Sequence, residues 1–169
     1  AGLAAAKQLN RAGHRVTVFE RDNKIGGLLR YGIPDFKMEK NVIDRRLKIL
    51  EAEGIIFKCE VEVGKTISAK EIEKEFDAIV LCTGASIKRE LPIPGAELNG
   101  VVQAMDFLPH NNKAVDGQLE REHRFLAKDK NVIVIGGGDT GSDCIGTSNR
   151  QGANSVTNFE IMPKPADGR

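Results

Sequence analysis

NVIVIGGGDTG, residues 131–141, is the stretch that decides the fold of this 169-residue chain. Its first five residues are rich in β-branched types and predict a buried strand. Gly136, Gly138 and Gly141 then fit the pattern G-x-G-x-x-G, and the apolar periodicity after them predicts a helix. A strand, a tight glycine turn and a helix start can hold the diphosphate of a dinucleotide through backbone N–H groups. Alone, the pattern is a weak indication, because such a turn can be a plain connection.

The same arrangement occurs a second time at the start of the chain. The first twenty residues, AGLAAAKQLNRAGHRVTVFE, align with residues 140–160, TGSDCIGTSNRQGANSVTNFE. Gly2 falls on Gly141, and Glu20 falls on Glu160. In each copy an acidic residue ends a short strand about 20 residues beyond the glycine turn, where a carboxylate can accept hydrogen bonds from ribose hydroxyls. A solvated glutamate is the competing interpretation of either copy, but the shared spacing favours ribose binding.

The repeat predicts an α/β fold with two Rossmann-like units, each built on a doubly wound parallel sheet. Gly2 can only be the third glycine of its turn, so we expect the first unit to lack its first strand and the chain to be a fragment of a longer protein. We expect the second unit to end after one strand–helix–strand. The predicted organisation is a first unit over residues 1–106, a connecting segment over 107–130 and a second unit over 131–169.

Composition argues against several classes of function. The formal net charge of +1 gives no electrostatic reason to expect nucleic acid or an anionic membrane as a partner. No apolar run approaches the ~18 residues of a membrane-spanning helix. The three cysteines form no C-x-x-C pair and the three histidines lack metal-ligand spacing, so we predict no metal site. Unpaired cysteines in apolar contexts suit a cytosolic protein, and no catalytic acid or base stands out.

Periodicity predicts the remaining elements. Helices are expected over residues 3–11, 36–53 and 68–76, the last of them beginning with a capping box. Short strands are expected over residues 16–19, 55–57 and 78–82. Residues 25–35 contain too many glycines for a helix and too many apolar residues for an exposed linker. We expect them to form a loop that lies against a cofactor, with a buried turn as the alternative.

With both glycine turns in place, the chain resembles the small (β) subunits of glutamate synthase and, more broadly, flavoproteins with two dinucleotide-binding domains. The similarity extends through nearly all residues and is most specific in GGLLRYGIPDFK, residues 26–37. The stretches LCTGA, VIVIGGGDTGSDC and NFEIMPKP add to it. This resemblance implies that the first unit binds FAD and the second binds NADH or NADPH.

The resemblance also implies the residues that contact the cofactors. For FAD they are Gly2, Glu20, Gly26, Gly27, Leu28, Lys37, Val63, Thr83 and Gly84. For the nicotinamide dinucleotide they are Gly138, Asp139, Thr140, Gly141 and Glu160, with Gly136 completing the glycine turn. Glu160 favours NADH because a carboxylate repels a 2′-phosphate, whereas Lys164 lies close enough in sequence to pair with one. The preference for either nucleotide therefore stays open.

The implied function is hydride transfer from NAD(P)H to FAD, with electrons then passing to iron–sulfur clusters for glutamate synthesis from glutamine and 2-oxoglutarate. The clusters would lie in parts of the protein outside this sequence, and the implied partner is the glutamate synthase large (alpha) subunit. We expect the isolated fragment to be inactive and to bind FAD poorly. The alternatives are another flavin-dependent reductase subunit, pyrimidine dehydrogenase-like or ferredoxin-linked, and a non-catalytic nucleotide-binding module.

Overall fold

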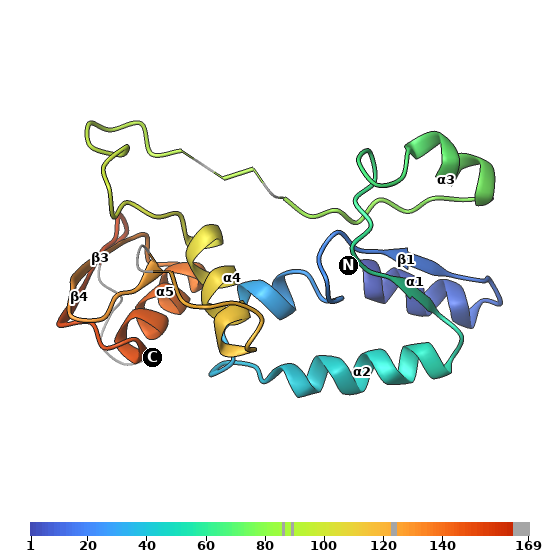
Figure 1. Cartoon of the computed structure of the whole chain (residues 1–169), viewed down its shortest axis with the longest axis horizontal. Helices are drawn as coiled ribbons and strands as arrows, with labels where there is room; N and C mark the ends of the chain where they lie inside the picture. Colours follow the sequence, from blue (N-terminus) through green and yellow to red (C-terminus); the bar gives the residue numbers. More distant parts are fainter. Residues whose placement is uncertain (86, 89, 123–124, 164–169) are drawn as a thin grey trace. The chain divides into compact units, whose positions relative to one another are not determined.

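A computed structural model gives the arrangement of the chain (Figure 1). It describes all residues except 86, 89, 123, 124 and 164–169. The chain divides into two compact units, each of which contains a two-stranded parallel sheet and helices. This arrangement confirms the expected α/β class with two separate parallel sheets.

The two units are interleaved in sequence. Unit 1 comprises Ala1–Arg30 and Met38–Ile87, and unit 2 comprises Tyr31–Lys37 and Lys88–Arg169. The structural boundaries therefore differ from the division at residues 106 and 130 that was drawn from the repeat. A heptapeptide from the first half of the sequence, residues 31–37, belongs to the unit that contains the second glycine turn.

Unit 1 is built around the parallel pair β1 (Thr17–Phe19) and β2 (Ile56–Lys58). Helix α1 (Gly2–Arg11) precedes β1, and helix α2 (Lys40–Ala52) connects the two strands. The buried core contains residues from both helices and the residue just before β2, namely Ala6, Leu50 and Ile55. Because Glu20 directly follows β1, its backbone lies at the carboxyl end of this sheet, where open α/β sheets bind their ligands.

Helix α3 (Ala69–Glu75) confirms the expected capping box. The Ser68 hydroxyl accepts a hydrogen bond from the Glu71 backbone N–H at 3.2 Å, and the Ser68 backbone N–H donates to the Glu71 carboxylate at 2.8 Å. Both bonds satisfy N–H groups that the first turn of a helix leaves without partners. The helix therefore begins where the sequence pattern places it.

The prediction of a strand over residues 78–82 is wrong. The segment forms no strand, and the side chains of Ile79, Val80 and Leu81 are 47%, 57% and 83% exposed. An apolar run of this kind suits a strand that is buried within a parallel sheet. Strand structure requires a hydrogen-bonded neighbour, and the described part of unit 1 supplies none for this segment.

Two further expectations around residues 25–53 are corrected. Residues Leu28–Gly32 form a π-helical turn, although the glycine content argued against any helix there. The helix expected from residue 36 begins only at Lys40, because Pro34 and Lys37 first form a turn through a 3.0 Å backbone hydrogen bond. The extended backbone of Glu39, with ψ of 136°, then caps α2.

Unit 2 contains the parallel pair β3 (Asn131–Ile135) and β4 (Ser155–Phe159), with helix α5 (Asp139–Arg150) between them in sequence. All three elements lie where the sequence predicts them. One face of the sheet packs on the core formed by Leu108, Val134 and Cys144. Glu160 directly follows β4, so the two acidic residues of the repeat end strands in separate parallel sheets.

Helix α4 (Ala104–Val115) occupies part of the segment expected to be a connection. It contains Pro109, and no helix was predicted in this part of the sequence. The helix forms because Leu108 is buried against the core of unit 2, and because Asn112 has a structural partner. The Asn112 amide donates hydrogen bonds of 2.9 and 3.1 Å to the backbone carbonyls of Tyr31 and Ile33. Tertiary contacts therefore outweigh local propensity here.

Candidate dinucleotide-binding sites

The glycine turn between β3 and α5 places each of its three glycines in a different environment. Gly136 has a φ of 109°, a left-handed conformation that favours glycine. A Cβ atom on Gly141 would lie 2.2 Å from the Gly136 carbonyl oxygen, so the helix and the turn approach too closely for a side chain. A Cβ atom on Gly138 would meet no heavy atom within 4 Å. The turn therefore leaves open space at Gly136 and Gly138 and is closely packed where Gly141 meets the Gly136 carbonyl.

The open position at Gly138 is also where α5 begins. Gly138 is the N-cap residue of α5, and Gly138, Asp139 and Thr140 are all exposed. The first N–H groups of a helix have no partners within the helix, and they carry the positive end of its dipole. The exposed start of α5 can therefore accept an anionic group such as a diphosphate.

The carboxylate of Glu160 lies over this glycine turn. Its Oε1 atom accepts hydrogen bonds from the backbone N–H groups of Ile161 and Met162 at 2.7 and 3.1 Å. A Cβ atom on Gly137 would lie 1.8 Å from the Oε2 atom, so only glycine leaves room for the carboxylate. Hydrogen bonds from Met162, Ile161 and Gly137 hold the pKa of Glu160 below its usual range. The group is therefore a fixed negative charge at neutral pH.

Asn158 is a structural residue of the turn that sequence reasoning missed. Its side-chain amide donates hydrogen bonds to the backbone carbonyls of Val134 and Gly136, both at 3.0 Å. The Gly136 N–H in turn donates to the Phe159 carbonyl at 2.8 Å. These bonds attach the end of β4 to the glycine turn. The repeat contained the signal, since Asn158 aligns with the apolar Val18 of the first copy.

Unit 1 contains nearly all of the residues expected to contact FAD. All of them except Lys37 lie in this unit, namely Gly2, Glu20, Gly26, Gly27, Leu28, Val63, Thr83 and Gly84. The side chains of Leu28 and Val63 are 62% and 48% exposed, and Thr83 is exposed as well. The Glu20 carboxylate accepts a 3.1 Å hydrogen bond from the Asp22 N–H, so it contacts the loop that follows β1. Leu28, Val63 and Thr83 are therefore accessible in unit 1, and Glu20 lies at the carboxyl end of its sheet.

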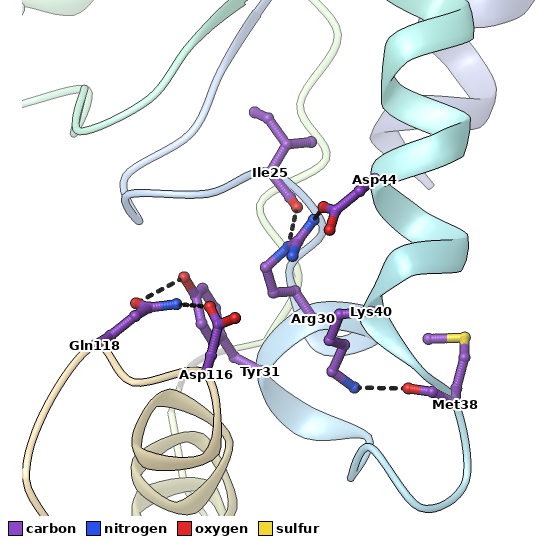
Figure 2. Close-up of polar contacts among 8 residues, drawn as sticks. All are labelled: Ile25, Arg30, Tyr31, Met38, Lys40, Asp44, Asp116 and Gln118. Atoms are coloured by element: carbon purple, nitrogen blue, oxygen red, sulfur yellow. Dashed lines mark hydrogen bonds and ion pairs between the residues drawn. The ribbon is translucent and has the colours of Figure 1, made fainter.

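Arg30 holds the glycine loop of unit 1 in place, and sequence reasoning missed it. Its side chain is only 3% exposed, its Nε atom donates to the Ile25 carbonyl at 2.8 Å, and its guanidinium forms an ion pair with Asp44 of α2 (Figure 2). A Cβ atom on Gly26 would lie 2.9 Å from the Arg30 Cβ atom. The available signal was an arginine in an otherwise apolar stretch.

Lys37 belongs to unit 2, whereas the other residues expected to contact FAD belong to unit 1. Its Nζ atom is 2.5 Å from the Asp143 Oδ1 atom of α5. The heptapeptide that carries it is anchored in unit 2 by Asn112 and by a 3.3 Å hydrogen bond from the Tyr31 hydroxyl to Gln118, which is drawn in Figure 2. The expectation that Lys37 contacts FAD stays a prediction.

Among the described residues, no cluster of three or more histidine, cysteine, aspartate or glutamate side chains could hold a metal ion. Within the same part of the chain, no helix combines the length and apolarity that crossing a bilayer requires. The expected NADPH-pairing residue, Lys164, lies outside the described residues.

Several relatives of this chain are named as glutamate synthase chains. It is 58% identical over its whole length to the glutamate synthase (NADPH) small chain of Mycobacterium tuberculosis, of which it spans 36%. It is 52% identical to the corresponding small chain of Bacillus subtilis, with 97% of this chain and 34% of that one aligned. The glutamate synthase (NADH) of Schizosaccharomyces pombe is 51% identical over 98% of this chain and 8% of its own length. The chain thus spans about a third of the bacterial relatives that it matches.

The fold has a counterpart among solved structures. Mycobacterium tuberculosis FprA, solved in complex with NADPH, superposes with a TM-score of 0.72 at 23% identity, over 92% of this chain and 40% of FprA. At that identity the likeness concerns the fold alone, and it confirms the predicted fold class. The sequence profile of one protein family matches residues 1–168. The chain therefore belongs to the pyridine nucleotide-disulphide oxidoreductase family.

Proposed function

We propose that this chain is the dinucleotide-binding part of an oxidoreductase subunit that passes a hydride from NAD(P)H to FAD. Unit 2 holds the nicotinamide dinucleotide and unit 1 contributes to the FAD site. One observation carries the proposal: Gly138 is open at the start of α5, Gly136 adopts a left-handed conformation, Gly141 packs against the Gly136 carbonyl, and the ionised Glu160 lies over the same turn. Diphosphate and ribose groups need these two features side by side.

The residues of unit 2 divide the binding between main chain and side chain. The backbone N–H groups at the start of α5 hold the diphosphate, and the exposed Gly138 lets it approach the main chain. Glu160 accepts hydrogen bonds from ribose hydroxyls. It can do so without giving up its bonds to Ile161 and Met162, because a carboxylate has about four lone-pair positions and its Oε2 atom is the one directed toward Gly137.

In unit 1 the same division applies to FAD, with Glu20 at the carboxyl end of β1 as the ribose acceptor. Gly26 and Gly27 have φ values of 139° and 52°, conformations that bring main chain rather than side chains to the surface of the loop. When bound, the two cofactors supply the hydride chemistry. The chain supplies position and electrostatics, and this reaction requires no side-chain acid or base.

The choice between NADH and NADPH depends on Glu160. A carboxylate at this position favours a free 2′-hydroxyl and repels a 2′-phosphate. The relatives are named for both nucleotides, NADPH in Mycobacterium tuberculosis and NADH in Schizosaccharomyces pombe. Turnover of the full-length polypeptide with each nucleotide decides between them. A strong preference for NADPH would refute the ribose role of Glu160.

The names of the relatives support a proposal for the complete polypeptide. We infer that the complete polypeptide acts as the small chain of glutamate synthase, with a large subunit as partner and with iron–sulfur clusters outside the present sequence. The cytosol is the proposed location. Co-purification of the full-length polypeptide with a large subunit that hydrolyses glutamine tests the partner. A different electron acceptor would instead identify another flavin-dependent reductase of the same family.

The direct test is optical. The full-length polypeptide that contains this sequence should carry flavin, and anaerobic addition of NADH or NADPH should bleach its visible absorbance. The variant Glu160→Gln should raise the KM for NADH roughly tenfold, because a charge-assisted hydrogen bond contributes about 1.5–3 kcal/mol. Glu75→Gln, an exposed glutamate at the end of α3, is the matched control and should leave KM unchanged. A full-length protein without flavin, or with flavin that neither nucleotide reduces, would refute the proposal.

A further inference from the structure

A partly buried ion pair joins Lys37 to the second turn of α5, below the proposed diphosphate position. Asp143 is the fifth residue of α5 and is 7% exposed. Its Oδ1 atom is 2.5 Å from the Nζ atom of Lys37, whose side chain is 38% exposed. With a rise of about 1.5 Å per residue, Asp143 lies roughly 6 Å along the axis from the start of the helix.

Lys37 is the compensating charge for this carboxylate. The Asp143 Oδ1 atom has no aligned hydrogen bond with any described residue, so its neutralisation depends on the ion pair. A buried carboxylate without a partner is costly, and a buried pair is strongly destabilised when one member is removed. The charge of Asp143 also contributes, after burial, to raising the pKa of the adjacent Cys144.

The heptapeptide that carries Lys37 is fixed in unit 2 by two further contacts. Asn112 donates hydrogen bonds to the carbonyls of Tyr31 and Ile33. The Phe36 ring packs so closely on α5 that a Cβ atom on Gly146 would lie 2.6 Å from it, and the Arg150 guanidinium stacks on the ring with its central carbon 3.7 Å from the ring centroid. The segment that carries Lys37 is therefore held in unit 2 by its own contacts, beside Asp143.

The electrostatic consequence concerns the start of α5. A diphosphate at this position would meet two acidic residues on the same helix, Asp139 and Asp143. A like charge about 8 Å away at an effective dielectric constant of ~20 weakens the binding of a unit charge by roughly tenfold or more. Lys37 removes this repulsion for Asp143, since the pair is neutral as a whole.

We propose that Lys37 is a positioning residue of the NAD(P)H site, which acts by neutralising Asp143 so that the start of α5 retains its affinity for the diphosphate. This inference rests on the proposed function of unit 2. It differs from the role that family resemblance implies for Lys37, direct contact with FAD. The two roles predict different results for a substitution of Lys37. A positioning role predicts weaker binding of NAD(P)H with unchanged flavin content, whereas a FAD contact predicts lower flavin content with unchanged binding of NAD(P)H.

The experiment uses variants of the full-length polypeptide and measures three quantities: the flavin content, the Kd for NADH and NADPH by fluorescence titration, and the dependence of that Kd on salt. Lys37→Met should raise the Kd roughly tenfold at low ionic strength and much less at high ionic strength, where the repulsion is screened. Flavin content should stay unchanged. Asp143→Asn should lower the Kd, and the double variant should return it toward the wild-type value.

Two controls separate this effect from a general one. Lys37→Arg retains the positive charge and should bind the dinucleotide nearly as the wild type does. Lys88→Met removes a positive charge from the exposed pair of unit 2, in which Lys88 lies 3.4 Å from Asp106, and should leave the Kd and its salt dependence unchanged. If Lys37→Met fails to fold, Asp143→Asn decides, because the proposal requires tighter binding in that variant.

The inference is overturned if Lys37→Met lowers the flavin content while the Kd for NAD(P)H is unchanged, because that result identifies a FAD contact. It is also overturned if Asp143→Asn binds no tighter, if the double variant does not return toward the wild-type Kd, or if the salt dependence of Lys37→Met matches that of the wild type. A wild-type protein that binds neither nicotinamide dinucleotide would instead refute the proposed function of unit 2.

Discussion

Alanine substitutions at Gly141 and Gly138 should separate the two tasks of the glycine turn. In Gly141→Ala the new Cβ atom would start 2.2 Å from the Gly136 carbonyl oxygen, whereas real Cβ contacts essentially never fall under 3.0 Å. The backbone must therefore move by at least the difference, 0.8 Å. Overpacking of this kind costs about 1–3 kcal/mol, so we expect the apparent melting temperature to fall by roughly 3–10 °C.

Gly138→Ala should have the opposite profile. A Cβ atom there meets nothing within 4 Å, and the φ of −73° suits any residue, so the loss of stability should stay under about 1 kcal/mol. The methyl group would nevertheless cover the main chain that the diphosphate must approach. We expect the Kd for NAD(P)H to rise roughly tenfold or more, which corresponds to at least ~1.4 kcal/mol.

The assay combines thermal unfolding with dinucleotide titration of the full-length polypeptide, and adds hydrogen exchange over residues 139–150 to locate the change. Gly141→Ala should speed exchange across α5, whereas Gly138→Ala should leave it as in the wild type. The reasoning fails if Gly138→Ala binds dinucleotide normally, since its backbone then does not face the ligand. It also fails if Gly141→Ala is as stable as the wild type.

Two further predictions concern the cores of the units. Leu50→Ala should destabilise unit 1 by about 2–5 kcal/mol in chemical denaturation, because Leu50 is 1% exposed and packs in the core with Ile55; a loss under ~1 kcal/mol would contradict that packing. Burial, and secondarily the Asp143 charge, raise the pKa of Cys144 to about 11, so about one thiol in a thousand is ionised at pH 8. Iodoacetamide at pH 8 should therefore label the exposed Cys82 long before Cys144, as mass spectrometry can show, and equal labelling rates would contradict this prediction.

The second glycine turn was predicted correctly because every signal there is local. β-Branched residues, glycines at fixed spacing and a following amphipathic segment define β3, the turn and α5 within residues 131–150. Gly141 illustrates this, because it packs against Gly136, which lies only five positions earlier in the sequence. The capping box at Ser68 was predictable for the same reason.

Other expectations failed where the outcome depended on distant residues. The apolar segment over residues 78–82 has the composition of a strand, but a strand also needs a neighbour that supplies hydrogen bonds. Residues 107–115 were expected to belong to a connecting segment, but burial of Leu108 and the bonds from Asn112 to residues 31 and 33 stabilise a helix there. Neither partner can be identified from the local sequence.

The sequence by itself determined the two dinucleotide-binding patterns, the strands and helix of the second one, and the acidic residue that ends each copy. Only the tertiary structure decided that residues 31–37 belong to unit 2, where Lys37 neutralises Asp143. The two residues are separated by 106 positions, from 37 to 143, and no periodicity or spacing rule connects them. A buried charge takes whichever partner the folded chain brings within a few ångströms, because the cost of leaving it unpaired depends on its surroundings and not on its distance in sequence.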